Sequence, residues 1–246
     1  MSFHVARLEE ALGTRLLDRG SRRVQPTEAG QRLLPRAREL LTLADAARDD
    51  VVGGEPGGTV QIEASTVPAT FLLPRVLARM DAPGVSVTLK VSDSARALTA
   101  LLERRCDIAV VGSRPRDGRV LTHRVGEDHI VLVGRIADPV PTRLEEVTLV
   151  VREPESGTRR AAAGVLPDRG RRVQVGSTEA TRRCVLEGVG YSLLSDLAVE
   201  EDVRAGRLRV FEWPDTPIRR SFYAARLRQV TPSAATRRLW SALRSS

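Results

Sequence analysis

Lysine, aromatic residues, cysteine and long apolar runs are all scarce in this chain of 246 residues. Aromatic residues make up 3% of it, and Lys90 is the only lysine. No apolar run approaches the roughly 18 residues that a membrane-spanning helix needs, and the first residues lack the order of a secretory signal. We therefore expect a cytoplasmic protein, in which Cys106 and Cys184 are buried or half-buried thiols rather than a redox pair.

The groups that usually carry catalysis are missing as well. The three histidines, His4, His123 and His129, stand beside no paired cysteine or carboxylate at metal-ligand spacing. The sequence contains no P-loop, no nucleophile elbow, and no glycine-rich dinucleotide fingerprint after a strand. It therefore predicts no metal, no cofactor and no catalytic residue.

Positive charge is plentiful, but only part of it is informative. The formal net charge is +8 and nearly all of the positive charge is arginine, an excess that GC-rich codon usage would also produce. Residues 15–38 hold seven arginines against Asp18 and Glu28, a local charge of +5. Such a local patch is better evidence for a nucleic-acid contact than the charge of the whole chain.

The N-terminal fifth of the chain reads as two helices joined by an arm. Val5, Leu8 and Leu12 form a one-sided apolar stripe that ends at Gly13, as many helices end. Thr27 is the expected N-cap of a long second helix, in which apolar residues recur at alternating spacings of 4 and 3: Leu33, Ala37, Leu40, Ala44, Ala47 and Val51. A period of 3.5 residues is typical of a coiled-coil dimer seam; the alternative is a helix packed on its own domain.

From residue 59 the pattern changes to alternating strands and helices. Strands are predicted at 59–65, 84–91, 106–112, 147–151, 171–175 and 191–195, and helices at 70–80, 94–105, from about 156, and at 179–188. This order predicts parallel strands with right-handed crossovers. The segments 129–134 and 219–227 suit strands that cross between two lobes around a cleft, and the helix 233–244 is expected to pack back on the first lobe.

The N-terminal motifs resemble those of LysR-type transcriptional regulators. They are Leu8-Glu9-Glu10-Ala11-Leu12-Gly13, then Leu16-Leu17-Asp18-Arg19, the Arg22-Arg23 wing, and Thr27-Glu28-Ala29-Gly30. Leu17 stands where the family usually has Phe. The resemblance implies a partial winged helix-turn-helix and a dimerisation helix, followed by an α/β effector domain of two lobes that is similar to type 2 periplasmic binding proteins.

The resemblance also implies a division of the chain. Residues 1–26 are the remnant of the winged helix-turn-helix, 27–52 the dimerisation helix, 53–58 a linker, and 59–246 the effector domain. Lobe I is expected at about 59–130 and 221–246, and lobe II at about 131–220. The implied partners are DNA, a small anionic effector, and further copies of the chain in a homodimer or homotetramer.

In the family, two helices and the start of the recognition helix precede the position of Met1. The residues that the resemblance assigns to DNA are Ser2, Phe3, His4, Arg7, Arg22 and Arg23. Because a recognition helix reads bases mainly with its N-terminal residues, we expect this form not to bind an operator specifically, which a gel-shift assay tests. Either a misassigned start codon or a true truncation explains the pattern, and the intact wing and heptads favour the first.

The candidate effector site consists of small residues that follow strands in both lobes. They are Ser65, Thr66, Gly112, Ser113, Ser156, Gly157, Thr158, Ser177, Thr178 and, by resemblance, Gly190. Hydroxyls and backbone N–H groups at strand ends suit a small anion or a carboxylate, although each Ser or Thr is also an ordinary helix cap. The segment 152–159 resembles regulators of sulfur and selenium metabolism, and Arg152 and Arg159 offer charge.

Three functions remain to be compared. The first is a DNA-binding transcriptional regulator that a small anion controls. The second is a free-standing small-anion or solute-binding protein without DNA-binding activity, which the heptad helix argues against. The third is an enzyme on the same fold, which would need acid–base or phosphate-binding residues in the cleft.

Overall fold

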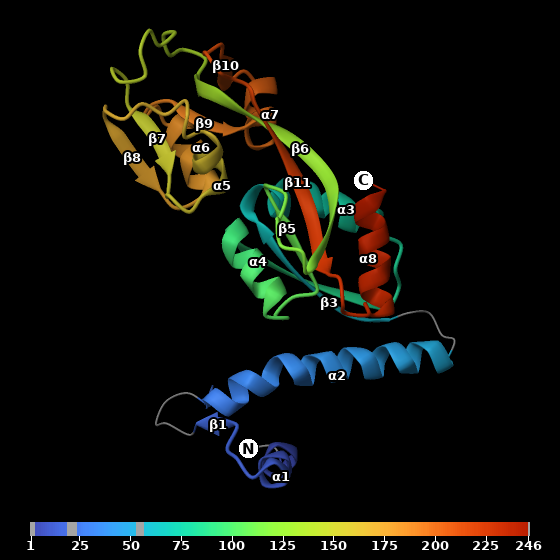
Figure 1. Cartoon of the computed structure of the whole chain (residues 1–246). Helices are drawn as coiled ribbons and strands as arrows, with labels where there is room; N and C mark the ends of the chain where they lie inside the picture. The colour runs from blue at the N-terminus through green and yellow to red at the C-terminus, as the bar shows by residue number, and fades with distance from the viewer. Residues whose placement is uncertain (1–2, 19–23, 53–56, 246) are drawn as a thin grey trace.

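The computed structural model describes residues 3–18, 24–52 and 57–245, in which a long N-terminal helix lies beneath two α/β lobes (Figure 1). The N-terminal part consists of α1 (Phe3–Leu12), the short strands β1 (Leu17–Asp18) and β2 (Gln25–Pro26), and α2 (Glu28–Val52). Within these described ranges no helix is long and apolar enough to cross a membrane.

The end of α1 is held by its own sequence motif. Gly13 has a φ of 64°, the left-handed conformation that favours glycine after a helix. One carboxylate oxygen of Glu9 accepts the backbone N–H groups of Leu16 at 2.7 Å and Leu17 at 3.1 Å. The chain therefore turns from the helix into β1 around a glutamate that belongs to the Leu-Glu motif.

The start of α2 confirms the predicted cap. The Thr27 hydroxyl accepts the Gly30 N–H at 3.1 Å and donates to the Arg15 carbonyl at 2.7 Å. A Cβ on Gly30 would lie 2.1 Å from the Leu16 carbonyl oxygen, so only glycine lets the helix approach β1 this closely. The Thr-x-Ala-Gly motif thus joins α2 to the arm.

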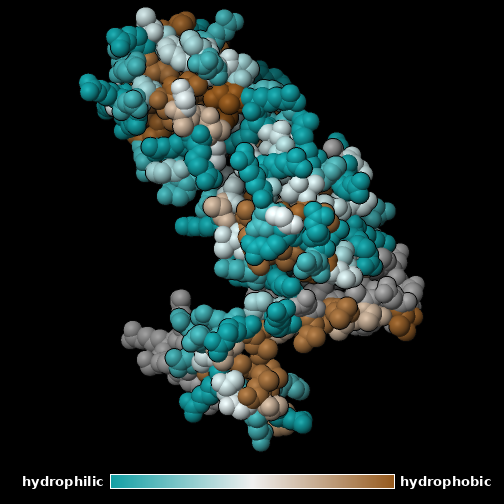
Figure 2. All heavy atoms as spheres, in the orientation of Figure 1, coloured by the Kyte–Doolittle hydropathy of each residue, from teal (hydrophilic) through white to brown (hydrophobic). Residues whose placement is uncertain are grey.

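The apolar seam of α2 is largely exposed in the isolated chain. Leu40 is 66% exposed and Val51 is 85% exposed. Figure 2 shows apolar residues along the side of α2 that faces away from the lobes. An apolar face without a partner in its own chain is a candidate surface for association.

The lobe nearer α2 is built on parallel strands, as predicted. β3 (Gly58–Ser65) pairs in parallel with both β4 (Val85–Ser92) and β5 (Ile108–Val111). The helices of this lobe are η1 (Pro68–Leu72), α3 (Leu73–Arg79), α4 (Ser94–Leu102) and the C-terminal α8 (Ala234–Arg244). Leu239 and Leu243 of α8 are fully buried against this core, which confirms that the last helix returns to the first lobe.

Two long antiparallel strands connect the lobes. β6 (Val120–Arg135) pairs with β11 (Ile218–Leu227) along the whole of β11, from Ile218 opposite Ile130 to Leu227 opposite Val120. Figure 1 shows both strands running from one lobe to the other.

The far lobe continues the sheet. β9 (Ser192–Ser195) and β10 (Leu208–Phe211) pair with the end of β6, and β7 (Leu149–Arg152) pairs in parallel with β8 (Arg172–Val175). The helices of this lobe are α5 (Gly157–Ala161), α6 (Thr178–Leu186) and α7 (Asp196–Arg204).

The structure differs from the sequence expectations in three places. The helix expected at 70–80 is divided, because a π-helical turn, η1, precedes α3. The sheet that joins the lobes is mixed rather than parallel, since β5, β11, β6 and β10 pair antiparallel in that order. The pattern also missed α7, β10 and the first half of β6, which extends the predicted 129–134 strand back to Val120.

Candidate effector site

A cavity of about 420 Å³ lies where the ends of β3, β4 and β5 meet the first residues of α5 and the residue before α6. The structure brings seven of the ten predicted effector residues to its wall: Ser65, Thr66, Gly112, Ser156, Gly157, Thr158 and Ser177. This size lies within the range of about 300–1,000 Å³ that is usual for small-molecule sites. The residues predicted from strand ends therefore line one cavity, and its use by an effector stays a prediction.

Arg220 is the most informative residue of this cavity. Its side chain is 8% exposed and forms two hydrogen bonds with Asp128, Nε to Oδ1 at 2.9 Å and Nη2 to Oδ2 at 2.5 Å. Nη1 also donates to the Thr158 hydroxyl at 3.2 Å. Because Arg220 and Asp128 lie on the crossing strands β11 and β6, this ion pair sits between the lobes, and Thr158 ties it to lobe II.

Arg152 lines the same cavity from the end of β7. Its side chain is 6% exposed and donates to both carboxylate oxygens of Glu153, from Nε at 2.8 Å and from Nη2 at 2.7 Å. Nη1 donates to the Thr178 hydroxyl at 2.5 Å. Partial burial alone would raise the pKa of Glu153, but the hydrogen bonds from Arg152 outweigh it, so the pKa lies below its ordinary value.

Two serines of the cavity cap their own helices, as the alternative interpretation required. The Ser156 hydroxyl accepts the Arg159 N–H at 3.4 Å, and the Ser177 hydroxyl accepts the Ala180 N–H at 3.0 Å. A capping hydroxyl uses a lone pair and keeps its proton. Each serine can therefore cap its helix and still donate a hydrogen bond into the cavity.

The cavity is close to charge-balanced. Asp93 caps α4 by accepting the N–H groups of Ala95 and Arg96, both at 2.9 Å, and its carboxylate pairs with the Arg96 guanidinium at 3.2 Å. Arg152 and Arg220 have carboxylate partners, and Glu155 adds a further negative charge to the wall. Any anion here is therefore held by oriented donors rather than by net positive charge.

Three predicted residues do not line the cavity. Ser113 is exposed beyond the end of β5. Thr178 does not line the cavity, but its hydroxyl accepts a hydrogen bond from the guanidinium of Arg152, which does. Gly190 lies two residues before β9, where a Cβ would approach the Thr148 carbonyl oxygen to 2.0 Å. Gly190 is thus a packing requirement and not a cavity residue, which corrects the expectation drawn from resemblance.

Arg159 also turns away from the cavity. Its Nη1 donates to the Arg152 carbonyl at 2.7 Å and to Gln174 Oε1 at 3.0 Å, which holds α5 against β7 and β8. Sequence reasoning missed Arg220, although one signal was present. Residues two apart on a strand share a face. Arg220 alternates with the apolar Phe222 and Ala224, which are buried, and this spacing places Arg220 on the buried face of β11.

The residues assigned to DNA lie partly outside the described ranges. Phe3, His4 and Arg7 are exposed on α1, with the Arg7 guanidinium 5.7 Å from the centre of the Phe3 ring. Ser2, Arg22 and Arg23 fall outside the described residues. Among the residues that are described, no group of three or more His, Cys, Asp or Glu side chains is arranged to hold a metal ion.

The fold and the cavity define a class: a two-lobed α/β ligand-binding domain joined to a helix with an apolar association face. The model of the LysR substrate-binding domain matches residues 53–246, and that of the lysR-family bacterial regulatory helix-turn-helix protein matches residues 1–31. The chain belongs to the LysR family of bacterial transcriptional regulators.

Transcriptional regulators are among the curated relatives of this chain. The transcriptional regulator YeiE of Escherichia coli K12 is 30% identical, with 94% of this chain and 82% of YeiE covered. The RuBisCO operon transcriptional regulator of Acidithiobacillus ferrooxidans is 26% identical over 91% of this chain and 77% of its own. A phosphonates import ATP-binding protein, PhnC of Anaeromyxobacter dehalogenans, is 36% identical over 79% of this chain but only 42% of its own length.

Solved structures support the fold. A full-length OxyR variant of Pseudomonas aeruginosa superposes with a TM-score of 0.75 at 18% identity, covering 98% of this chain and 86% of the OxyR chain. The regulatory domain of CcmR from Synechocystis, solved in complex with 2-PG, gives a TM-score of 0.69 at 23% identity, covering 76% of this chain and 96% of that domain. At these sequence identities the structural similarity supports the two-lobed fold and nothing further.

Proposed function

We propose that this chain senses a small oxyanion between its two lobes and that the bound anion sets the state of a LysR-type transcriptional regulator. The observation that carries the proposal is the pair of buried guanidinium groups, from Arg152 and Arg220, in one cavity. Guanidinium groups bind oxyanions through short, charge-assisted hydrogen bonds. The neighbouring hydroxyls of Ser65, Thr66 and Ser177 add neutral donors.

A count of donors supports this assignment. Arginine carries five N–H donors. Arg220 uses two on Asp128 and one on Thr158, and Arg152 uses two on Glu153 and one on Thr178. Against the residues that the structure describes, each guanidinium keeps two N–H groups for a ligand. The carboxylates hold both guanidinium groups in place before the ligand arrives.

Two resemblances narrow the ligand to tetrahedral oxyanions. The Anaeromyxobacter relative bears the name of a phosphonate import protein, which favours a phosphonate. The similarity of segment 152–159 to regulators of sulfur and selenium metabolism favours sulfate or selenate. These ions share a tetrahedral centre with at least three acceptor oxygens, and that shared chemistry is what we propose the cavity recognises.

The position of Arg220 suggests how binding acts on the protein. An anion in contact with Ser65 or Gly112 from lobe I and with Ser156 or Thr158 from lobe II touches both sides of the cleft. It binds the closed arrangement of the lobes more tightly than the open one, and a ligand shifts an equilibrium only by such a difference in affinity. The crossing strands β6 and β11 then carry the change toward α2.

A calorimetric titration tests the proposal. The purified chain is titrated with methylphosphonate, sulfate, selenate and acetate, and at least one tetrahedral anion is expected to bind more tightly than acetate. Arg220→Lys removes the two-pronged geometry and should weaken binding, whereas the matched exposed variant Arg160→Lys on α5 should not. Thr66→Val, which removes a hydroxyl without changing shape, gives a second variant if Arg220→Lys is unstable. No heat from any anion, or equal binding by all variants, refutes the proposal.

The remaining roles follow from the family and from exposed surfaces. We propose that α2 associates with a second copy along Leu33, Ala37, Leu40, Ala44, Ala47 and Val51, and that DNA contacts involve Ser2, Phe3, His4, Arg7, Arg22 and Arg23. The domain limits at 26, 52 and 58 belong to the same proposal. A regulator of this kind works in the cytoplasm and binds its effector without transforming it, so we infer no enzymatic activity.

A further inference from the structure

The ionisable groups around the cavity between the lobes carry more negative than positive charge. They are three guanidinium groups and four carboxylates: Arg96, Arg152, Arg220, Asp93, Glu153, Glu155 and Asp128, the partner of Arg220. A bare dianion such as sulfate brings further negative charge into this space and leaves every carboxylate without a new partner. The guanidinium groups therefore suit one end of a ligand, and the carboxylates suit a positive group at its other end.

Two of these carboxylates belong to opposite lobes. Asp93 precedes α4 in lobe I, and Glu153 follows β7 in lobe II. Burial is the largest influence that raises the pKa of Glu153, and the negative charge of Asp93 raises it as well, against the hydrogen bonds from Arg152. Asp93 thus repels Glu153 across the cavity that both residues line. A cation between them would be attracted by both carboxylates.

The carboxylates have acceptor sites left for such a cation. Asp93 accepts two backbone N–H groups and the Arg96 guanidinium, and Glu153 accepts two N–H groups of Arg152. An ionised carboxylate has about four lone-pair sites, so Asp93 and Glu153 each retain at least one. Glu155 is exposed just before α5 and forms no ion pair with any cation in the described ranges.

The size of the cavity and the spacing of its charged groups suit a small organic molecule. A volume of about 420 Å³ lies in the range of cavities that hold organic ligands. A Cβ on Gly157 would lie 3.8 Å from both Arg220 Nη1 and Ser94 Oγ. The Arg220 guanidinium therefore lies beside the first turn of α4, the turn that Asp93 caps. A short carbon chain is enough to join two groups bound at these places.

We propose that the effector is a zwitterion, in which a short carbon chain joins a tetrahedral oxyanion to an ammonium group. Arg152 and Arg220 hold the oxyanion, and Asp93, Glu153 and Glu155 surround the ammonium group. Aminoalkyl phosphonates and aminoalkyl sulfonates share this chemistry. The inference rests on the proposed function and adds to it a reason for closure. The ammonium group offsets the repulsion between Asp93 and Glu153, so the ligand favours the arrangement in which the lobes are close.

Calorimetric titration of the full chain tests the inference with two pairs of probes that match in shape. One pair is 2-aminoethylphosphonate and propylphosphonate, and the other is 2-aminoethanesulfonate and propanesulfonate. In each pair a methyl group replaces the ammonium group. The aminated member of at least one pair is expected to bind at least about tenfold more tightly, because it gains hydrogen bonds between charged groups. The pair with the tighter aminated member tells a phosphonate from a sulfonate.

Variants of the carboxylates should change the affinities for the two members of that pair differently. Asp93→Asn keeps a side chain that caps helices well but removes a negative charge. It should weaken the aminated probe about tenfold and leave the propyl probe unchanged or tighter. Glu155→Gln should act in the same sense at a position that caps no helix, which preserves the test if Asp93→Asn is unstable. Glu201→Gln removes an exposed carboxylate of α7 outside the cavity and should change neither affinity.

The inference and the proposed function fail through different results. If the propyl probes bind as tightly as the aminated ones, the effector is not a zwitterion, and the proposed oxyanion site still stands. The same conclusion holds if the carboxylate variants weaken both members of a pair equally. If neither the four probes nor any bare tetrahedral oxyanion gives heat, both the inference and the proposed function are wrong.

Discussion

The ion pair between Arg220 and Asp128 allows a quantitative test of how the two lobes are held together. Both side chains are almost fully buried, at 8% and 0% exposure, and two hydrogen bonds of 2.9 and 2.5 Å join them. Replacing either partner by an apolar residue, as in Arg220→Met or Asp128→Leu, leaves the other charge buried without compensation. Each single change should therefore cost about 3–5 kcal/mol of stability.

The double variant is expected to behave differently. Arg220→Met together with Asp128→Leu removes both charges, and apolar side chains of similar size often replace a buried ion pair at little cost. Its loss of stability should be smaller than the sum of the single losses by about 2 kcal/mol or more, since the two residues are in contact. The single variants should melt about 10 °C below the parent chain.

Urea unfolding followed by circular dichroism measures the cycle, with thermal melts alongside. A control is available one residue along each strand, where Glu127 pairs with Arg219 at 2.7 Å on the exposed side of the same ladder. Breaking that pair should have little effect, because exposed ion pairs are screened by water. If each buried single variant lowers the free energy of unfolding by less than about 1 kcal/mol, or if the two losses add in the double variant, the ion pair does not hold the lobes together.

Three further predictions concern other parts of the chain. Gly190→Ala should destabilise the effector domain by about 2 kcal/mol or more in a thermal melt, because its Cβ meets a carbonyl oxygen at 2.0 Å, whereas Gly118→Ala, with open space around it, should be neutral. Leu40→Glu should convert the dimer to a monomer in light scattering with helicity unchanged; a persisting dimer would exclude the α2 seam. Burial raises the pKa of Cys106 to about 12, so in a Cys184→Ser chain its alkylation should be slow at pH 8 and accelerate continuously with pH, and a plateau near pH 9 would contradict this.

The local motifs could be predicted because each depends on neighbours in sequence. The Thr27 cap, the left-handed Gly13 and the strands around the buried 108–111 segment follow from spacing and residue type. The failures share a different cause. The division of the helix at 70–80 and the strand β10 depend on the rest of the fold, with β10 paired to the distant β6, and no periodicity within the segment reports such pairing.

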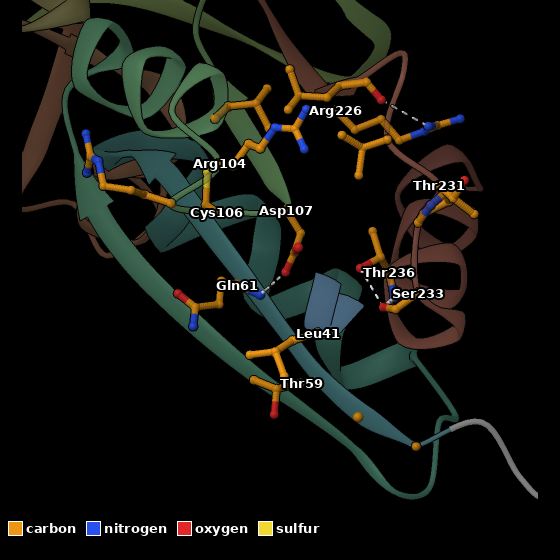
Figure 3. Close-up of a pocket in the computed structure, with 17 residues that line it drawn as sticks. Leu41, Thr59, Gln61, Arg104, Cys106, Asp107, Arg226, Thr231, Ser233 and Thr236 are labelled. Carbon is orange, nitrogen blue, oxygen red and sulfur yellow. Dashed lines mark hydrogen bonds between the residues drawn. The ribbon is translucent and has the colours of Figure 1, made fainter. Parts of the chain in front are cut away.

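The residues of the candidate effector site also fall into those that the sequence could predict and those that it could not. Its serines, threonines and glycines were visible at strand ends, since the carboxyl ends of parallel strands meet at one edge of a sheet. Arg220 was not identified, because its partner Asp128 is 92 residues away and only the antiparallel pairing of β6 and β11 brings them together. A further cavity, at the base of lobe I (Figure 3), was not predicted from the sequence either, because four separate segments of the chain build its wall.

The sequence by itself determined that a long helix with an apolar seam follows motifs similar to those of a winged helix-turn-helix, and that strands and helices then alternate. Those features are carried by short motifs and by regular periods, which act over one or two turns of helix or one strand. The tertiary structure decided where charge is buried and which serines face a cavity. Burial and opposition across strands are properties of the assembled sheet, and the free energy of a buried ion pair exists only once water has been excluded from both partners.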